Sequence, residues 1–216
     1  MSTKLSVFCS KIIEAGWLVA VVAVPLFFNI YSARTFEPDK ITLLRSVTMV
    51  MILAWIVMVV EQGFSGKNSG VSLGSRLRQW RKEPLFLPTV FLVILYIFST
   101  IFSLSPQVSL WGSYQRLQGT YSFLSYIVVF ALMAGNIRTF DQVDRLVTLI
   151  IIASVPVSLY GIVQRYGLDP LPWAGDVTTR VAANMGNAIF VASYLIMIIP
   201  ITISRLIESM AAIIRE

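Results

Sequence analysis

Arginines are the side chains in this 216-residue sequence that are best suited to bind a ligand. Arg116 and Arg180 each end a stretch rich in glycine and aromatic residues, shortly before an apolar segment, and Arg45 lies just inside another such segment. A guanidinium group offers a rigid fork of N–H donors that matches phosphate oxygens, and it keeps this geometry when it is partly desolvated. The pattern therefore indicates an anionic partner, for which phosphate is the favoured chemistry.

Gly186 and Asn187 form a second candidate feature, directly before the last apolar segment. Asparagine is a preferred helix N-cap, and the first turn of a helix presents unpaired N–H groups to anions. Arg180 stands seven residues before Asn187 and could fold over the same place. We therefore expect this turn to contribute to the same anion site.

Both features also have simpler explanations. The long side chain of Arg45 could reach the lipid headgroups without binding any specific ligand. Aromatic residues in these stretches could form the belt that membrane proteins place at the headgroup level; they are Trp111, Tyr114, Tyr121 and Trp173. Residue types alone do not separate a belt from a binding site.

The residue types that are missing exclude several classes of chemistry. The chain has no histidine and one cysteine, Cys9, so histidine-ligated haem, histidine-based zinc sites, Ser-His-Asp triads and an internal disulfide are excluded for this chain alone. We expect no cofactor and no metal. None of the eleven acidic residues falls in the middle of an apolar segment, which argues against a self-contained proton or sodium transporter.

The elements that must position these arginines are membrane helices. Hydrophobic residues make up 56% of the chain, charged residues only 13%, and mean hydropathy is +0.78. The charges are clustered between apolar stretches long enough to cross a bilayer. We predict an all-α polytopic membrane bundle, a single transmembrane domain over 1–216, with about six helices at 15–33, 41–60, 85–104, 121–137, 146–164 and 188–204.

The basic residues predict how the chain is oriented. Placing the basic loop 62–83 inside leaves six of the 17 basic residues outside and eleven inside, so both termini are predicted to be cytoplasmic. Leu73, Leu77 and Trp80 in this loop recur at helical spacing, which suits either a short helix on the inner leaflet or a solvated positive loop. The charge lies in short loops flanking the membrane, so we expect no nucleic-acid partner.

Two further sequence features concern the beginning of a helix. The first apolar segment follows Lys4 and Lys11 and could be read as a secretory signal, but its length favours a retained helix. Thr139 followed by Gln142 is the pattern of a capping box at the start of the fifth helix.

Two stretches resemble the O-antigen ligase and polymerase superfamily, multi-pass proteins that handle undecaprenyl-diphosphate-linked glycans at the outer side of the bacterial inner membrane. They are LWGSYQRLQGTYSFLSY at 110–126 and RVAANMGNAIFVASYL at 180–195, and FEPDKITLLR at 36–45 is a weaker third match. The resemblance implies a GT-C-like helical architecture in which Arg116 and Arg180 help to hold the lipid diphosphate. Gly186 and Asn187 would shape the turn beneath it.

The chain also departs from this family. Members usually have ten or more crossings and an essential histidine in their second half, whereas this sequence has about six and no histidine, so it resembles the first half only. Two functions follow as expectations. The chain is the N-terminal half of a ligase- or polymerase-like protein that binds the lipid-linked glycan, or it is a non-catalytic helical subunit of a larger membrane complex in contact with lipid and other subunits.

Overall fold

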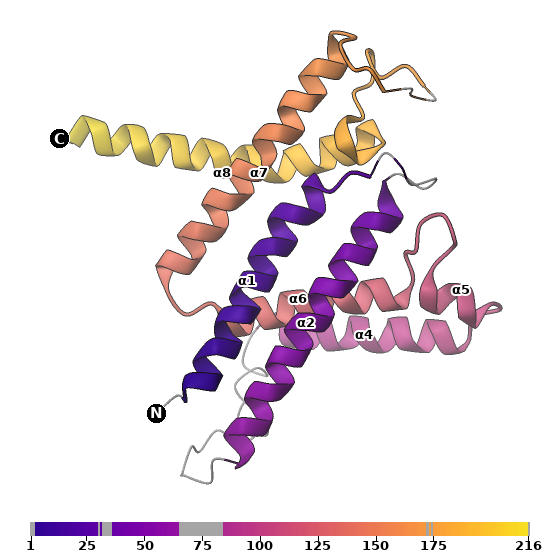
Figure 1. Cartoon of the computed structure of the whole chain (residues 1–216), viewed down its shortest axis with the longest axis vertical. Coiled ribbons are helices and arrows are strands. Elements are labelled where there is room, and N and C mark those ends of the chain that lie inside the picture. Colours follow the sequence, from indigo (N-terminus) through magenta and orange to yellow (C-terminus); the bar gives the residue numbers. More distant parts are fainter. Residues whose placement is uncertain are drawn as a thin grey trace. The chain divides into compact units, whose positions relative to one another are not determined.

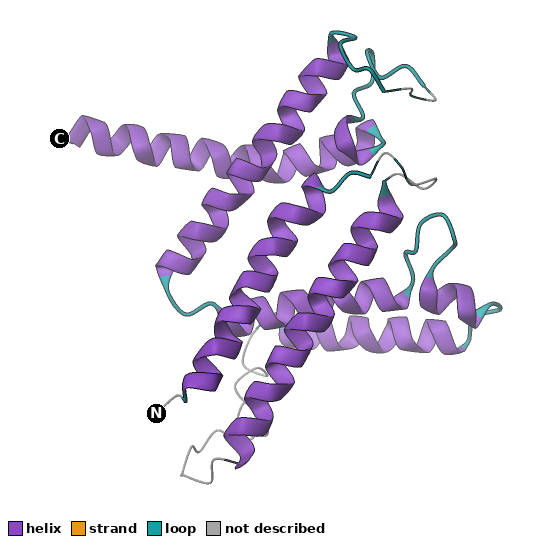
Figure 2. Cartoon of the chain, viewed as in Figure 1, coloured by secondary structure: helices purple, strands orange, loops and turns teal. Residues whose placement is uncertain are grey.

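The computed structural model describes residues 3–29, 31, 36–64, 84–171, 173 and 175–215. Over these residues the chain is all-α, as predicted (Figures 1 and 2). It contains seven α-helices and one 3-10 helix: α1 (Lys4–Leu26), α2 (Glu37–Phe64), α4 (Phe86–Ile101), α5 (Pro106–Trp111), α6 (Thr120–Asn136), α7 (Phe140–Arg165), η1 (Ala183–Met185) and α8 (Ala188–Arg215). The predicted surface helix around Leu73, Leu77 and Trp80 lies outside the described residues.

Four of these helices are long and apolar enough to cross a membrane, over Lys4–Leu26, Glu37–Glu61, Phe140–Arg165 and Ala188–Ile214. The helices α4 and α6 are apolar but have only 16 and 17 residues. At 1.5 Å per residue they rise about 24 to 26 Å, slightly less than the roughly 30 Å of a hydrocarbon core. The protein is therefore an integral membrane protein with about four long spans and two shorter apolar helices.

The long helices extend beyond the charge-free stretches that the sequence suggested. The first helix begins at Lys4 and not near residue 15, because Thr3 caps it by accepting a hydrogen bond from the N–H of Ser6 at 3.1 Å. It also ends at Leu26, before the predicted end at residue 33. Charged residues are tolerated in the first turns of a helix, so the absence of charge marks the apolar middle and not the ends.

Ends of three other long helices also lie outside the uncharged stretches. Helix α2 starts with Glu37 and Asp39 in its first turn, where negative charge favours the helix dipole. The predicted capping box of α7 is confirmed, with Thr139 and Gln142 each bonding the backbone N–H of the other. Helix α8 continues past residue 204 to Arg215.

The described helices belong to two compact units. The first unit consists of Met1–Trp17 and Ile41–Asn136, and the second of Leu18–Lys40 and Ile137–Glu216. In the first unit α1 meets α2 at Gly16, where an added Cβ would lie 2.4 Å from Cγ of Met51. Trp17 and Met51 are completely buried beside it. A small residue at this point thus allows two helices to pack closely, as is usual in membranes.

Helices α4 and α6 of the first unit lie side by side and are in contact (Figure 1). The rings of Tyr96 and Phe123 stack with centroids 3.6 Å apart, and the hydroxyls of Thr100 and Thr120 are hydrogen-bonded to each other. At the other end of this unit, Thr3 of the N-terminus donates to the carboxylate of Glu61 on α2.

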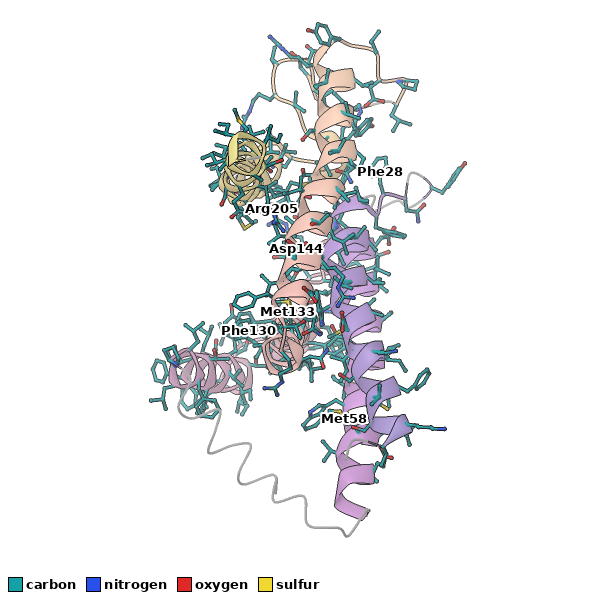
Figure 3. The ribbon with its side chains drawn as sticks, turned by 90° about the vertical axis from the view of Figure 1, so that its left-hand side faces the viewer. Phe28, Met58, Phe130, Met133, Asp144 and Arg205 are labelled. Atoms are coloured by element: carbon teal, nitrogen blue, oxygen red, sulfur yellow. The ribbon has the colours of Figure 1, made fainter. Side chains whose placement is uncertain are left out.

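In the second unit α7 packs against η1 and α8 around Val157, Ala183 and Val191. Asp144 near the start of α7 forms an ion pair with Arg205 of α8 (Figure 3). Only 11% of the apolar stretch of α8 is buried within the chain. Such helices need an apolar environment outside the chain, and membrane lipid supplies it.

Candidate functional site

A short loop between α5 and α6 is closed by two glycines. Gly112 has φ +89°, a conformation that side chains other than glycine rarely adopt. A Cβ on Gly119 would lie 2.4 Å from the backbone N of Gly112 and 2.5 Å from the carbonyl O of Leu110. The chain therefore returns to within contact of its own starting point, and we call residues 112–119 the Gly112–Gly119 loop.

Arg45 of α2 holds this loop in place. Its Nη2 donates to the carbonyl O of Leu117 at 2.7 Å and to that of Trp111 at 3.0 Å. Nη2 and Nε also reach the hydroxyl of Ser122, at 2.7 and 3.1 Å, and the guanidinium lies 4.5 Å from the ring centroid of Tyr121. Hydrogen bonds from a charged donor are among the stronger ones, so this arginine stabilises the loop backbone.

The contacts of Arg45 bear on its predicted role. All its described hydrogen bonds leave from Nε or Nη2 and end on the protein's own oxygens, while Nη1 has no partner among the described residues. Positioning of the loop was not foreseen from the sequence, which offered headgroup contact or phosphate binding. A direct phosphate contact of Arg45 stays a prediction.

Arg116 lies on the same loop and is exposed. The N–H groups of Arg116 and Leu117 both donate to the carbonyl O of Ser113, at 3.1 and 2.8 Å, which forms a tight turn. Tyr114 at this turn is 76% exposed. The loop thus combines a fixed backbone with a cation on its surface.

The turn at Gly186 and Asn187 lies in the second unit. Gly186 has φ +76°, and a Cβ there would lie 2.5 Å from the ring of Phe36. Asn187 accepts a hydrogen bond from the N–H of Ile189 at 2.9 Å, which confirms the predicted cap of α8. Arg180 is exposed, and its guanidinium has no partner among the described residues.

A buried polar cluster in the second unit was not predicted. Gln164, which is completely buried, accepts hydrogen bonds from the N–H groups of Ala182 and Ala183 at 3.1 and 2.7 Å. Its Nε2 donates to Asp169 at 3.1 Å. Gln164 therefore connects the end of α7 to the segment that precedes η1. A polar residue at the end of an apolar segment was the only signal of it in the sequence.

Asp169 is the acceptor at the centre of this cluster. It accepts hydrogen bonds from the hydroxyl of Tyr160 at 2.7 Å, from Nε1 of Trp173 at 2.8 Å and from the N–H of Leu171 at 3.0 Å. Burial raises the pKa of Asp169, but these hydrogen bonds and that of Gln164 outweigh it, so the pKa lies below its usual 3.8. The carboxylate is thus ionised at neutral pH and orders the loop around Trp173.

The predicted site residues fall into both units. Arg45 and Arg116 meet at the Gly112–Gly119 loop of the first unit, whereas Arg180, Gly186 and Asn187 lie in the second. The proximity of Arg116 to Arg180 stays a prediction. Within the described part of the chain no three acidic or cysteine side chains gather as metal ligands. Comparison with protein-family models, with curated proteins and with solved structures finds no match to this chain.

Proposed function

We propose that this chain binds the diphosphate of an undecaprenyl-linked glycan at the outer side of a bacterial inner membrane, as the N-terminal half of a protein similar to O-antigen ligases and polymerases. The observation that carries the proposal is the Gly112–Gly119 loop. Its backbone is fixed by Arg45, and Arg116 is exposed on its surface. A cation on an already ordered loop loses less entropy when an anion binds, so binding is stronger.

The roles of the residues in the resembling stretch support this assignment. Gly112 and Gly119 close the loop, and Leu117 and Ser122 are bonded by Arg45. The contacts of these four residues thus stabilise the loop itself. Arg116 is the charged residue of the loop, and we assign it to the ligand together with Arg180 of the second stretch.

The proposal includes six crossings with both termini inside. In the first unit, the contact between Thr3 and Glu61 lies at one end of α2, and the contacts of Arg45 with the loop lie towards its other end. The loop is thus placed at the end of α2 opposite the N-terminus, which suits an outer position if the N-terminus is cytoplasmic. The short helices α4 and α6 count as crossings here, since a bilayer can thin locally around short helices.

Binding of undecaprenyl diphosphate without any sugar tests the proposal. The full chain in phosphatidylcholine nanodiscs should bind this lipid more tightly than undecaprenol, which lacks the diphosphate. Arg116→Gln and Arg180→Gln should each weaken binding roughly tenfold or more, because a hydrogen bond to a charged group contributes about 1.5 to 3 kcal/mol. Arg138→Gln, at an exposed arginine two residues after the C-terminal end of α6, is the matched control and should bind as the unchanged chain does.

Equal affinity for undecaprenol and undecaprenyl diphosphate would overturn the proposal. The proposal assigns binding to this chain and assigns no catalytic step. A histidine-bearing second half in the gene's full reading frame would supply the rest of the enzyme that the resemblance implies.

A second candidate function is supported by the apolar surface. Every residue of α4 is at least partly exposed, and 17% of the apolar stretch of α7 is buried within the chain. Such faces suit a non-catalytic helical subunit that packs in a larger membrane complex. Purification in mild detergent with stoichiometric protein partners, together with no response to undecaprenyl diphosphate, would favour this function over the first.

A further inference from the structure

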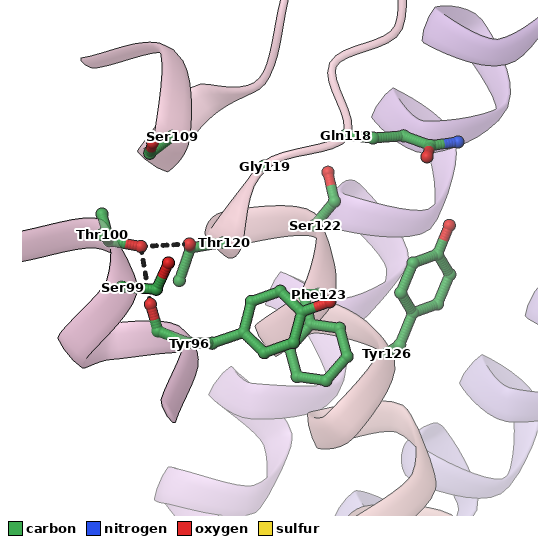
Figure 4. Close-up of a pocket in the computed structure, with 10 residues that line it drawn as sticks. All are labelled: Tyr96, Ser99, Thr100, Ser109, Gln118, Gly119, Thr120, Ser122, Phe123 and Tyr126. Carbon is green, nitrogen blue, oxygen red and sulfur yellow. Dashed lines mark hydrogen bonds between the residues drawn. The ribbon is translucent and has the colours of Figure 1, made fainter. Parts of the chain in front are cut away.

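A cavity lies between α4, α5 and α6, next to the Gly112–Gly119 loop (Figure 4). Its volume is about 300 Å³, at the lower end of the range for small-molecule sites. Ten residues line it, all from the first unit: Tyr96, Ser99, Thr100, Ser109, Gln118, Gly119, Thr120, Ser122, Phe123 and Tyr126.

The lining residues are rich in hydroxyl groups. Seven of the ten side chains carry one, an eighth is the amide of Gln118, and none of the ten is an Asp, Glu, Lys or Arg. The flanking helix α4 is otherwise strongly apolar and exposed. Neutral hydrogen-bond donors and acceptors are therefore gathered at this cavity, beside a helix that is otherwise apolar.

Part of this hydroxyl set is bonded within the chain. Thr100 donates to the carbonyl O of Tyr96 at 2.8 Å and shares a hydrogen bond with Thr120, and Ser122 donates to the carbonyl O of Leu117 at 2.6 Å (Figure 4 shows the Thr100 contacts). These bonds hold the walls together.

Three other polar groups of the lining are left for a ligand. The hydroxyls of Tyr96 and Ser99 and the amide of Gln118 make no hydrogen bond to any residue that the structure describes. Tyr96 and Ser99 stand on α4, whereas Gln118 stands on the loop and its amide is directed away from α4 (Figure 4). Together they offer both donors and acceptors.

The charge of the lining restricts what can bind. No cation is among the ten lining residues, and Arg45, which bonds the lining residue Ser122, directs Nε and Nη2 to Ser122 and to the backbone of the loop. An anion would lose its hydration with no cation among the lining residues to offset this loss, which is costly. An alkyl chain would leave the free hydroxyls unpaired, which is costly as well.

The aromatic residues of the lining provide an apolar ring surface. Tyr96 stacks on Phe123, and Tyr126 stands on the same helix as Phe123. An apolar ring surface beside free hydroxyls matches a molecule with a C–H face and a hydroxyl rim. We propose that this cavity binds one neutral sugar ring. This inference goes beyond the proposed function, which concerns the diphosphate and the arginines.

Two sources can supply such a ring: a lipid headgroup or a sugar in the aqueous phase. The test uses the full chain in phosphatidylcholine nanodiscs and two probes, a monohexosyl diacylglycerol and a methyl hexoside, with diacylglycerol as the sugar-free reference. Native mass spectrometry counts the bound lipid, and titration calorimetry measures the soluble hexoside. We expect the hexosyl lipid to bind at least about tenfold more tightly than diacylglycerol, since each ring hydroxyl bonded strengthens binding about fivefold.

Two variants test the residues. Ser99→Val and Gln118→Leu should each weaken hexosyl-lipid binding about two- to tenfold, the effect of one lost hydrogen bond. Thr89→Val is the matched control, because Thr89 is on the same helix, bonds its own backbone at Leu85 and does not line the cavity. Circular dichroism and gel filtration verify that each variant is folded.

The results of these experiments distinguish the source of the sugar and can overturn the proposal. Binding of the methyl hexoside identifies an aqueous source, and binding of the hexosyl lipid alone identifies a headgroup source. Equal binding of hexosyl lipid and diacylglycerol with no binding of the hexoside overturns the proposal, as do unchanged affinities in both variants. Neither probe contains phosphate, so failure of this proposal is distinct from failure of diphosphate binding.

Discussion

Nη2 of Arg45 lies 2.7 Å from the carbonyl O of Leu117, a residue 72 positions further along the chain. Leu117 has φ +52°, in the left-handed region that non-glycine residues occupy at a cost. The hydroxyl of Ser122 donates to the same carbonyl at 2.6 Å. Two donors on one carbonyl thus offset the unfavourable backbone of the residue next to Arg116.

Replacing Arg45 tests this relationship. We expect Arg45→Lys to lower the free energy of unfolding by about 2 kcal/mol, because a lysine cannot bond Leu117, Trp111 and Ser122 at once. The measurement is reversible unfolding in mild detergent, with limited proteolysis to detect opening of the Gly112–Gly119 loop. Arg180→Lys, at an exposed arginine of the second unit, is the control. Equal stability of the two variants would show that the Arg45 contacts contribute nothing.

The glycine closure of the loop gives a second prediction. Gly119→Ala should destabilise the protein by about 1 to 3 kcal/mol, because its Cβ would meet the backbone of Gly112 and Leu110, which cannot move aside as a side chain can. Gly175→Ala is the control, since a Cβ at Gly175 has nothing within 4 Å. Thermal unfolding of the two variants in the same detergent checks this. A melting temperature of Gly119→Ala equal to that of Gly175→Ala would contradict the closure.

The buried amide of Gln164 gives a third prediction. Gln164→Leu keeps the volume but leaves the N–H groups of Ala182 and Ala183 without an acceptor, so we expect a loss of about 2 to 5 kcal/mol. Gln107→Leu, at an exposed position of α5, should change stability little. Hydrogen exchange adds a local test, because the amides of Ala182 and Ala183 should exchange faster in the variant. Unchanged exchange at these two amides would rule out the assigned role.

The sequence predicted the fold class because membrane helices are defined by long apolar stretches. It did not predict the ends of α1 or α8. The predicted helices followed uncharged stretches of sequence, whereas α1 contains the charged residues Lys4 and Glu14. The ends signalled by local chemistry were predicted correctly, as at Thr139 and Asn187, where a side chain caps its own helix.

The candidate site was predicted only in part for a related reason. Short-range features such as the turn at Gly186 can be read from neighbouring residues. The contacts of Arg45 with Trp111 and Leu117 join distant segments, and no local pattern encodes them. The hydroxyl cavity likewise depends on which faces of α4 and α6 meet.

Acidification gives a fourth prediction, at Asp169. Its pKa is lowered in the folded protein, so the carboxylate stabilises the fold fully above the usual value of 3.8 and progressively less as the pH falls below it. The indole N–H of Trp173 donates to this carboxylate, so its NMR resonance should shift as the pH is lowered below about 4. Asp169→Asn should remove the titration. A Trp173 resonance that titrates identically in the variant would assign the change to another group.

The position of the Gly112–Gly119 loop gives the last prediction. In a Cys9→Ser background, single cysteines are placed at Lys4 and Tyr114, both exposed. If α4 and α6 both cross the membrane and the N-terminus is inside, an impermeant maleimide should label Tyr114→Cys in intact spheroplasts and Lys4→Cys only after permeabilisation. Labelling of both positions on the same side would contradict the six crossings, because α4 and α6 would then enter and leave the bilayer from one face. Arg116 would in that case not reach the outer surface, and the proposed diphosphate site would lose its location.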